Sequence, residues 1–164
     1  MRIRQARVED LAAIVKIELE NFSADEAMSQ EVLEAHIKHC KTSFLVAEQE
    51  GELLGYLEGP VQAERHLKDL SFTTEVIDES EHVGGYISIT SLSISPQAQG
   101  LGVGKALLNA MKEVAQKDGR LGINLTCHDY LIAYYERHGF VNEGVSYSQY
   151  AGEIWYDLVW EPEK

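Results

Sequence analysis

The most constraining feature of the sequence is a run of three closely spaced glycines between an alternating apolar segment and an amphipathic one. Gly100, Gly102 and Gly104 follow the segment 86–95 and open a helical pattern that Gly119 ends. One face of that helix gathers Val103, Ala106, Leu107, Ala110, Met111 and Val114. Glycines let backbone N–H groups approach an anion, and the helix N-terminus adds a favourable dipole. The pattern therefore predicts a strand, turn and helix that hold a phosphate-bearing ligand.

Two common nucleotide-binding motifs do not fit this turn. The GxGxxG motif needs a third glycine where Lys105 or Leu107 stands, and the Walker A motif needs Ser or Thr where Ala106 follows Lys105. The turn is therefore interpreted as a pyrophosphate site of another kind, with a plain glycine-rich turn as the alternative.

The segment that precedes the turn changes the phase of its apolar alternation. Ile87 and Ile89 are apolar at odd positions, whereas Leu92 and Ile94 are apolar at even positions. One extra residue near Ser91 would return all four side chains to one face, which predicts a β-bulge. The alternative is a strand that ends early.

The whole chain, residues 1–164, is predicted to form a single α/β (α+β) domain. The expected strands cover 3–6, 44–47, 53–57, 86–95, 123–126, 140–145 and 154–160, and the other expected helices cover 8–21, 29–39 and 129–138. Residues 60–85 show no clean periodicity and are expected to form a long mobile loop with one helical turn. Such a loop is either a binding lid or a solvated insertion.

The net charge of −13 argues against nucleic acid or an anionic membrane surface as a partner. Residues 96–140 alone are close to neutral, with five basic and four acidic side chains, so an anionic cofactor meets the least repulsion there. The acidic remainder would attract cations, including amines, although solubility is the simpler explanation of the charge. We expect no secretory leader and no membrane-spanning run, and two cysteines without a CxxC motif favour the cytoplasm.

Two motifs in this order resemble the GNAT superfamily of N-acetyltransferases. Gln99, Gly102 and Gly104 match its Q/R-x-x-G-x-G/A signature after a bulged strand, and residues 134–140 match its Y-E-x-x-G-F segment. The resemblance implies a mixed, mostly antiparallel sheet of about seven strands with a bulged fourth strand, flanked by about four helices. Within the superfamily, the segments 21–27, 125–129 and 135–140 are most similar to arylalkylamine (serotonin-type) N-acetyltransferase.

The resemblance implies acetyl-CoA as the donor, bound without a metal. Backbone groups of Leu92, Ser93 and Ile94 would align the pantetheine chain. The pyrophosphate would lie on the turn formed by Gln99, Gly100, Leu101, Gly102, Val103, Gly104 and Lys105. Tyr135 would protonate the departing CoA thiolate, since a phenol with a pKa near 10 is protonated at neutral pH.

The base that takes the proton of the amine is less clear from the sequence. The serotonin-type enzymes carry two histidines on the bulged strand, and Ser88 and Thr90 stand at the matching positions here. Neither hydroxyl is a base at neutral pH, but both can line a water path. Glu58 is the best alternative carboxylate, a mechanism without a dedicated base remains open, and His128 is the histidine to consider if neither applies.

These observations predict an N-acetyltransferase in which a primary amine attacks acetyl-CoA directly in a ternary complex. The expected acceptor is a small arylalkylamine-like compound or a polyamine. The alternatives are the N-terminus or a lysine of a peptide or protein, or a CoA-binding sensor without turnover. His36, His39 and Cys40 share a helical face, but no ligand from a distant part of the chain presents itself, so no metal is expected. The chain is expected to be a monomer or a homodimer.

Overall fold

The computed structural model describes residues 1–163, which form two β-sheets. The first sheet has the order β1 (Arg2–Gln5), β2 (Phe44–Gln49), β3 (Glu52–Glu58) and β6 (Ser91–Ile94). The second has the order β4 (Val61–Gln62), β5 (Tyr86–Ile89), β7 (Gly122–Cys127), β9 (Tyr156–Trp160) and β8 (Val141–Val145). The pair β5–β7 is parallel and the other pairs are antiparallel. The predicted mixed, mostly antiparallel α/β architecture is confirmed.

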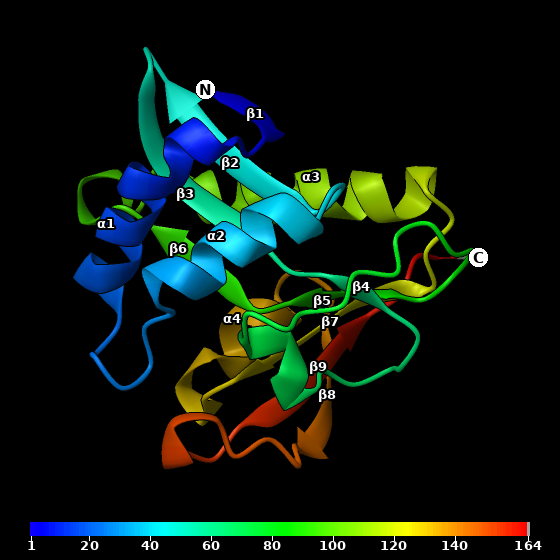
Figure 1. Cartoon of the computed structure of the whole chain (residues 1–164). Helices are drawn as coiled ribbons and strands as arrows, with labels where there is room; N and C mark the ends of the chain where they lie inside the picture. Colours follow the sequence, from blue (N-terminus) through cyan, green and yellow to red (C-terminus); the bar gives the residue numbers. More distant parts are fainter. Residues whose placement is uncertain (164) are drawn as a thin grey trace.

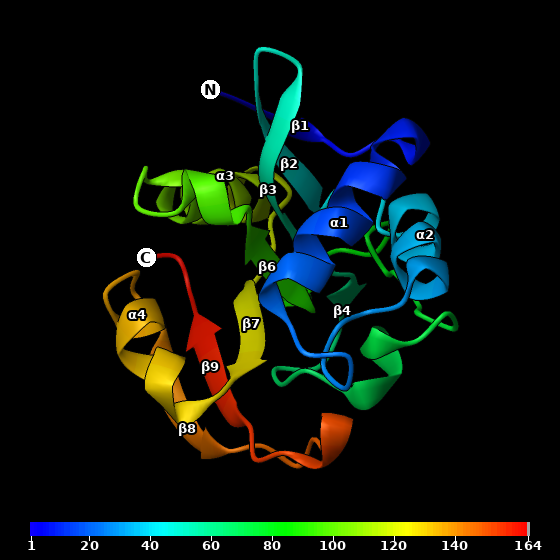
Figure 2. The same cartoon turned by 90° about the vertical axis from the view of Figure 1, so that its left-hand side faces the viewer.

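Four α-helices cover the sheets, as predicted (Figure 1). They are α1 (Leu11–Asn21), α2 (Gln30–His39), α3 (Val103–Lys117) and α4 (Ile132–Glu136). Figure 2 shows α1 and α2 on one side of the sheets and α3 and α4 on the other. The expected helices at 8–21 and 129–138 each begin with a short 3₁₀ turn, at Val8–Asp10 and Asp129–Leu131. Among the described residues, no helix is both long and apolar enough to span a bilayer.

Each helical layer buries its own apolar core against the sheets. Leu107, Leu108 and Met111 of α3 are fully buried in a cluster with Ile87 of β5 and Ile123 of β7. On the opposite side, α1 and α2 bury a second cluster against the first sheet, which includes Ile14, Leu33, Phe44 and Tyr56. Burying one such side chain contributes roughly 1.5–3 kcal/mol, so both faces of the sheets stabilise the fold.

The predicted bulge lies between β5 and β6. Ser91 is paired with Glu58 in the β3–β6 register, and the backbone N–H of Thr90 also donates to the carbonyl of Glu58 at 2.8 Å. Two residues on one strand therefore oppose one residue on its neighbour, which is the definition of a bulge. Before the bulge the chain pairs with β7, as β5, and after it the chain pairs only with β3, as β6, so a gap opens between β6 and β7.

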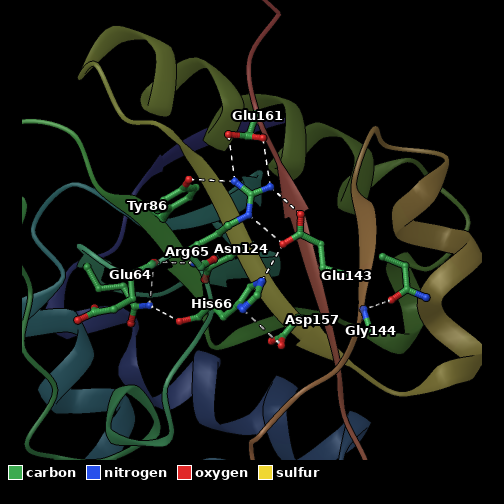
Figure 3. A network of polar contacts seen from close by, with 11 residues as sticks. Glu64, Arg65, His66, Tyr86, Asn124, Glu143, Gly144, Asp157 and Glu161 are labelled. Carbon is green, nitrogen blue, oxygen red and sulfur yellow. Dashed lines mark hydrogen bonds and ion pairs between the residues drawn. The ribbon is translucent and has the colours of Figure 1, made fainter.

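The predicted long loop is fastened to the second sheet at its start (Figure 3). The guanidinium of Arg65 contacts Glu143 of β8 at 2.6 and 2.9 Å, and Nε2 of His66 lies 2.7 Å from the same carboxylate. The hydrogen bonds from Arg65, joined by the contact with His66, lower the pKa of Glu143 to about 2. Asn124 of β7 donates to the carbonyl of Arg65 at 2.7 Å. The loop also contains the short strand β4 and one 3₁₀ turn, Asp69–Phe72.

Candidate active site

Two cavities meet where β6 leaves β7. A wide cleft of about 640 Å³ lies over β6 and the N-terminus of α3, and a narrow cavity of about 110 Å³ lies between α1, β7 and the segment before β9. Leu92, Leu131 and Tyr135 line both. A ligand in the wide cleft can therefore meet a second ligand in the narrow cavity beside these three residues.

The free edge of β6 supplies backbone hydrogen-bonding groups to the wide cleft. In an antiparallel ladder, alternate residues direct their N–H and C=O groups to the same side. Ser95 donates to Leu54 of β3 at 2.8 Å, so the backbone groups of Leu92 and Ile94 point away from β3, toward the cleft. The side chain of Asn21 confirms this direction, since it donates to the carbonyl of Ile94 at 2.7 Å.

The glycine turn presents an uncapped helix N-terminus to the same cleft. Gly100 and Gly102 have φ values of +81°, a left-handed conformation that favours glycine. No side chain caps α3, and the first N–H groups of a helix have no partner within it. A Cβ on Gly104 would lie 2.5 Å from the hydroxyl of Tyr134, so a side chain at this position would require the ring of Tyr134 to move.

The structure brings nearly all of the predicted cofactor residues together. The cleft is lined by Leu92, Ser93, Ile94, Gln99, Gly100, Gly102, Val103, Gly104 and Lys105. Leu101 is the exception, because its side chain is 71% exposed and lies outside the lining.

Positive charge gathers at the α3 end of the cleft. The pKa of His138, which lines the cleft, is lowered by burial and by the charges of Lys112, Lys105 and Arg137. Lys105 also lines the cleft. In a chain with a net charge of −13, this end of the cleft is suited to an anionic ligand.

Aromatic side chains and two carboxylates surround the narrow cavity. The walls are Phe22, Phe72, Tyr130, Tyr150 and Trp155. The rings of Phe72 and Tyr150 lie 4.5 Å apart, and the ring of His128 stacks on Trp155 at 4.3 Å. Nε2 of His128 lies 3.0 Å from the carboxylate of Glu26. Phe72 comes from the predicted loop 60–85, so that loop contributes to the cavity.

The two residues of the bulge line the narrow cavity with hydroxyl groups. Thr90 donates its hydroxyl proton to Oε1 of Glu58 at 2.6 Å, and Ser91 donates its own to Oε1 of Glu18 at 2.9 Å. Because both protons are directed at carboxylates, the remaining lone pairs of the hydroxyl oxygens are available to an N–H group. Thr90 was predicted as a site residue. Ser91 was not, and it lines the cavity because of the bulge.

Glu18 is the functional candidate that the sequence reasoning missed. It comes from α1, lines the narrow cavity and is only 2% exposed. Its carboxylate accepts hydrogen bonds from the backbone N–H of Met28 at 2.8 Å and from the hydroxyls of Ser91 and Tyr56. Burial raises its pKa despite these hydrogen bonds, and the charge of Glu58 adds to the shift. The sequence signal that could have identified it is its spacing: Glu18 follows Ile14 by four residues and therefore lies on the buried face of the helix.

Glu58 lies behind the bulge rather than in the narrow cavity. It is completely buried, and its Oε2 lies 2.6 Å from Nδ1 of His36 on α2. Burial lowers the pKa of His36, but the charge of Glu58 and this hydrogen bond outweigh burial and raise it overall. Ligand-type atoms of His36, Cys40 and Glu58 lie within 4.8 Å of one another. Two ligands of one tetrahedral zinc lie about 3.3 Å apart, so the closer contact of His36 with Glu58 is a hydrogen bond.

Tyr135 and Ser88 are placed differently from one another. Tyr135 lines both cavities at their junction, and its ring packs edge-on against Tyr134 and Phe140. Burial raises the pKa of Tyr135 well above its ordinary value, so its phenol is protonated at neutral pH.

Ser88 is completely buried and lies outside the lining of both cavities. Its hydroxyl has no hydrogen-bond partner among the described residues.

Comparisons with known proteins identify the family and the fold of the chain. A sequence model of the acetyltransferase (GNAT) family matches residues 11–140. An N-alpha-acetyltransferase of Sulfurisphaera tokodaii is 32% identical over 118 residues, which cover 69% of this chain and 64% of that protein. The chain thus spans less than two thirds of the length of this curated relative.

Solved structures share the fold over almost the whole chain. The GphF GNAT-like decarboxylase in complex with isobutyryl-CoA has a TM-score of 0.84, with 18% identity and coverage of 98% of this chain and 99% of the other. Ard1 from Thermoplasma volcanium has a TM-score of 0.73, with 20% identity and coverage of 99% and 98%. At these identities the likeness concerns the fold, while the match to the family rests on sequence. The chain therefore belongs to the acetyltransferase (GNAT) family.

Proposed function

We propose that the protein transfers an acetyl group from acetyl-CoA to a primary amine by direct attack within a ternary complex. The observation that carries the proposal is the meeting of an anion-adapted cleft and an amine-adapted cavity at Tyr135. Family membership supports it, as does the name of the 32% identical relative, an N-alpha-acetyltransferase.

The residues of the wide cleft fit acetyl-CoA from end to end. The N–H groups of the glycine turn and the charge of Lys105 would hold the pyrophosphate. The backbone groups of Leu92 and Ile94 would pair with the amides of the pantetheine chain along the free edge of β6. That path leads the thioester toward Leu92 and Tyr135, where the two cavities join.

The chemistry at the junction needs one proton donor and one proton acceptor. As the amine nitrogen bonds to the acetyl carbon, the carbon–sulfur bond breaks and the sulfur takes a proton from the phenol of Tyr135. The proton of the amine would pass to Ser91 or Thr90, each of which already donates to a buried carboxylate, Glu18 or Glu58. This modifies the expected water path along Ser88 and Thr90, because Ser88 lies away from the cavity.

The walls of the narrow cavity favour a cationic amine that is joined to an apolar or aromatic body. Aromatic faces attract cations, and the carboxylates of Glu18 and Glu26 add negative charge. A polyamine would place a second charge against mostly apolar walls. An arylalkylamine-like compound and the N-terminal residue of a polypeptide both satisfy the cavity, and the named activity of the curated relative supports the polypeptide.

A panel of acceptors tests the proposal. Purified protein is incubated with acetyl-CoA and an arylalkylamine, a diamine, a lysine derivative or short peptides with free α-amines, and thiol release and N-acetylated product are both measured. Acceptor-dependent release of thiol with matching product supports the proposal. CoA binding without turnover on any acceptor would instead support a sensor, and thiol release without an amine would indicate hydrolysis.

Several expectations from the sequence remain predictions. We still expect a cytoplasmic protein that is a monomer or a homodimer and has no nucleic-acid partner. Cys40 and Cys127 are free and buried, as suits a reducing compartment.

Gly102 should be required for CoA binding. We expect Gly102→Val to weaken CoA binding at least about tenfold, because a branched side chain strains the left-handed backbone and projects beside the α3 N-terminus. Gly119→Val is the matched control, since Gly119 has a φ of +71° just beyond the other end of the same helix. Calorimetric titration of CoA should show the loss for Gly102 alone. Equal affinities for both variants would contradict the assignment of the pyrophosphate site.

A further inference from the structure

A buried chain of hydrogen bonds leads from the narrow cavity to α2. It begins at the hydroxyl of Thr90, which lines the cavity and donates to Oε1 of Glu58 at 2.6 Å. The other oxygen of the same carboxylate, Oε2, lies 2.6 Å from Nδ1 of His36. Glu58 and His36 are both 0% exposed, so solvent does not compete for either contact.

The pattern of donors fixes the protons along this chain. A carboxylate only accepts, so Thr90 and the Nδ1–H of His36 both donate to Glu58. Nε2 of His36 makes no hydrogen bond of standard geometry among the described residues, but the backbone carbonyls of Ser71 and Thr73 lie near the ring and help to raise its pKa. Both the neutral Nδ1 tautomer and the charged ring carry the Nδ1–H that Glu58 accepts. The hydroxyl proton of Thr90 therefore points away from the cavity, and its lone pairs point toward it.

We propose that His36 is a positioning residue for acetyl transfer: by holding Glu58, it fixes the Thr90 hydroxyl so that its oxygen accepts a hydrogen bond from the incoming amine. The inference rests on the proposed function and extends it to a residue that contacts neither cavity. Without His36, Glu58 would be a buried carboxylate that lacks one of its two side-chain donors. Thr90 would then lose the fixed acceptor that sets its orientation.

Protonation of this pair should lower activity. The titratable groups around His36 are Glu58 on β3, Cys40 on its own helix and, through Glu58, Glu18 on α1. Burial, together with the charges of Glu58 and Asp78, raises the pKa of the Cys40 thiol, so the thiol stays neutral. The charge of Glu58 and its hydrogen bond raise the pKa of His36. An added proton would reduce the attraction of Glu58 for the Thr90 proton and would release the hydroxyl to turn toward the amine.

The test compares three variants on the best acceptor of the panel. His36→Ala should lower kcat/KM by about 10²-fold, because misplacement of a positioning group is costly. His36→Asn keeps an N–H near the position of Nδ1 and should recover about tenfold of that loss. The acidic limb of the pH profile should move in both variants. His39→Asn, an exposed histidine on the same helix, should leave the rate and the profile unchanged.

A double-mutant cycle separates positioning from a general loss of stability. Thr90→Val should lower the rate by itself, and His36→Ala should add little to it if both act through the same hydroxyl. The inference would be overturned if the losses of rate in the two single variants were fully additive in the double variant. It would also be overturned if His36→Ala lost activity while its acidic limb did not move and His36→Asn did not recover the rate. Either outcome would leave the proposed function standing. Absence of turnover in the parent protein on every acceptor would overturn both.

Discussion

Replacement of Tyr135 by phenylalanine should lower kcat by about 10²- to 10⁴-fold, the range that general acid catalysis typically contributes. The substitution keeps the ring, whose edge-on contacts with Tyr134 and Phe140 belong to the core, and removes only the hydroxyl. CoA affinity should change little, because the proposed positions of the pyrophosphate and pantetheine groups are the glycine turn and the edge of β6. Steady-state and single-turnover rates, measured with calorimetric CoA binding, test this expectation.

The control for this experiment is Tyr147→Phe, which removes the same hydroxyl from a fully exposed tyrosine outside both cavities. It should match the parent protein in rate and affinity. An unchanged single-turnover rate in Tyr135→Phe would remove Tyr135 from the chemistry, since slow product release cannot mask a single turnover.

Local sequence patterns were sufficient for the fold because its elements have short-range signatures. The phase change between Ile89 and Leu92 predicted the bulge, and the glycines before Val103 predicted the start of α3. The short strand β4 was not predicted, because Val61 and Gln62 become a strand only through pairing with β5. Its two residues carry no periodic pattern of their own.

The cofactor side of the site was predictable for the same reason, whereas the acceptor side was not. The wide cleft is built around one continuous stretch of chain, 92–105, and all of the residues predicted to bind the cofactor lie in that stretch. The narrow cavity takes its walls from segments far apart in the chain, such as Phe22, Phe72 and Trp155. The contact of His36 with Glu58 likewise spans 22 residues, a separation at which no sequence period applies.

Ser88 illustrates how alternation alone can mislead. Ser88 and Thr90 are two residues apart and were expected to act together at the position of the missing histidines. The bulge begins at Thr90, so only Thr90 reaches the cavity, while Ser88 remains buried within the paired part of the strand. The extra residue instead brings Ser91 and, behind it, Glu18 to the site.

Replacement of Glu18 by glutamine should lower kcat/KM at least about 10²-fold, because the site loses the buried carboxylate toward which Ser91 directs its proton. The matched control is Glu20→Gln, an exposed glutamate two residues further along α1, which should keep the parent rate. Ser91→Ala leaves the carboxylate in place but removes the hydroxyl between it and the cavity, so its rate should fall between those of the parent and Glu18→Gln.

The pH dependence gives the sharper test of Glu18. Burial raises its pKa, so in the parent protein kcat/KM should rise with pH through a limb above the ordinary range of a glutamate. This limb should vanish in Glu18→Gln, which leaves only the acidic limb expected from protonation at His36 and Glu58. Stability should respond in the same window. A group whose pKa is raised on folding contributes its stability below the unfolded pKa and loses it as pH rises through the folded one. The parent should therefore lose stability over that window while the variant does not. A pH-rate profile that is the same in the variant as in the parent, with CoA affinity and thermal unfolding intact, would assign the proton acceptor to Glu58 or to the solvent instead.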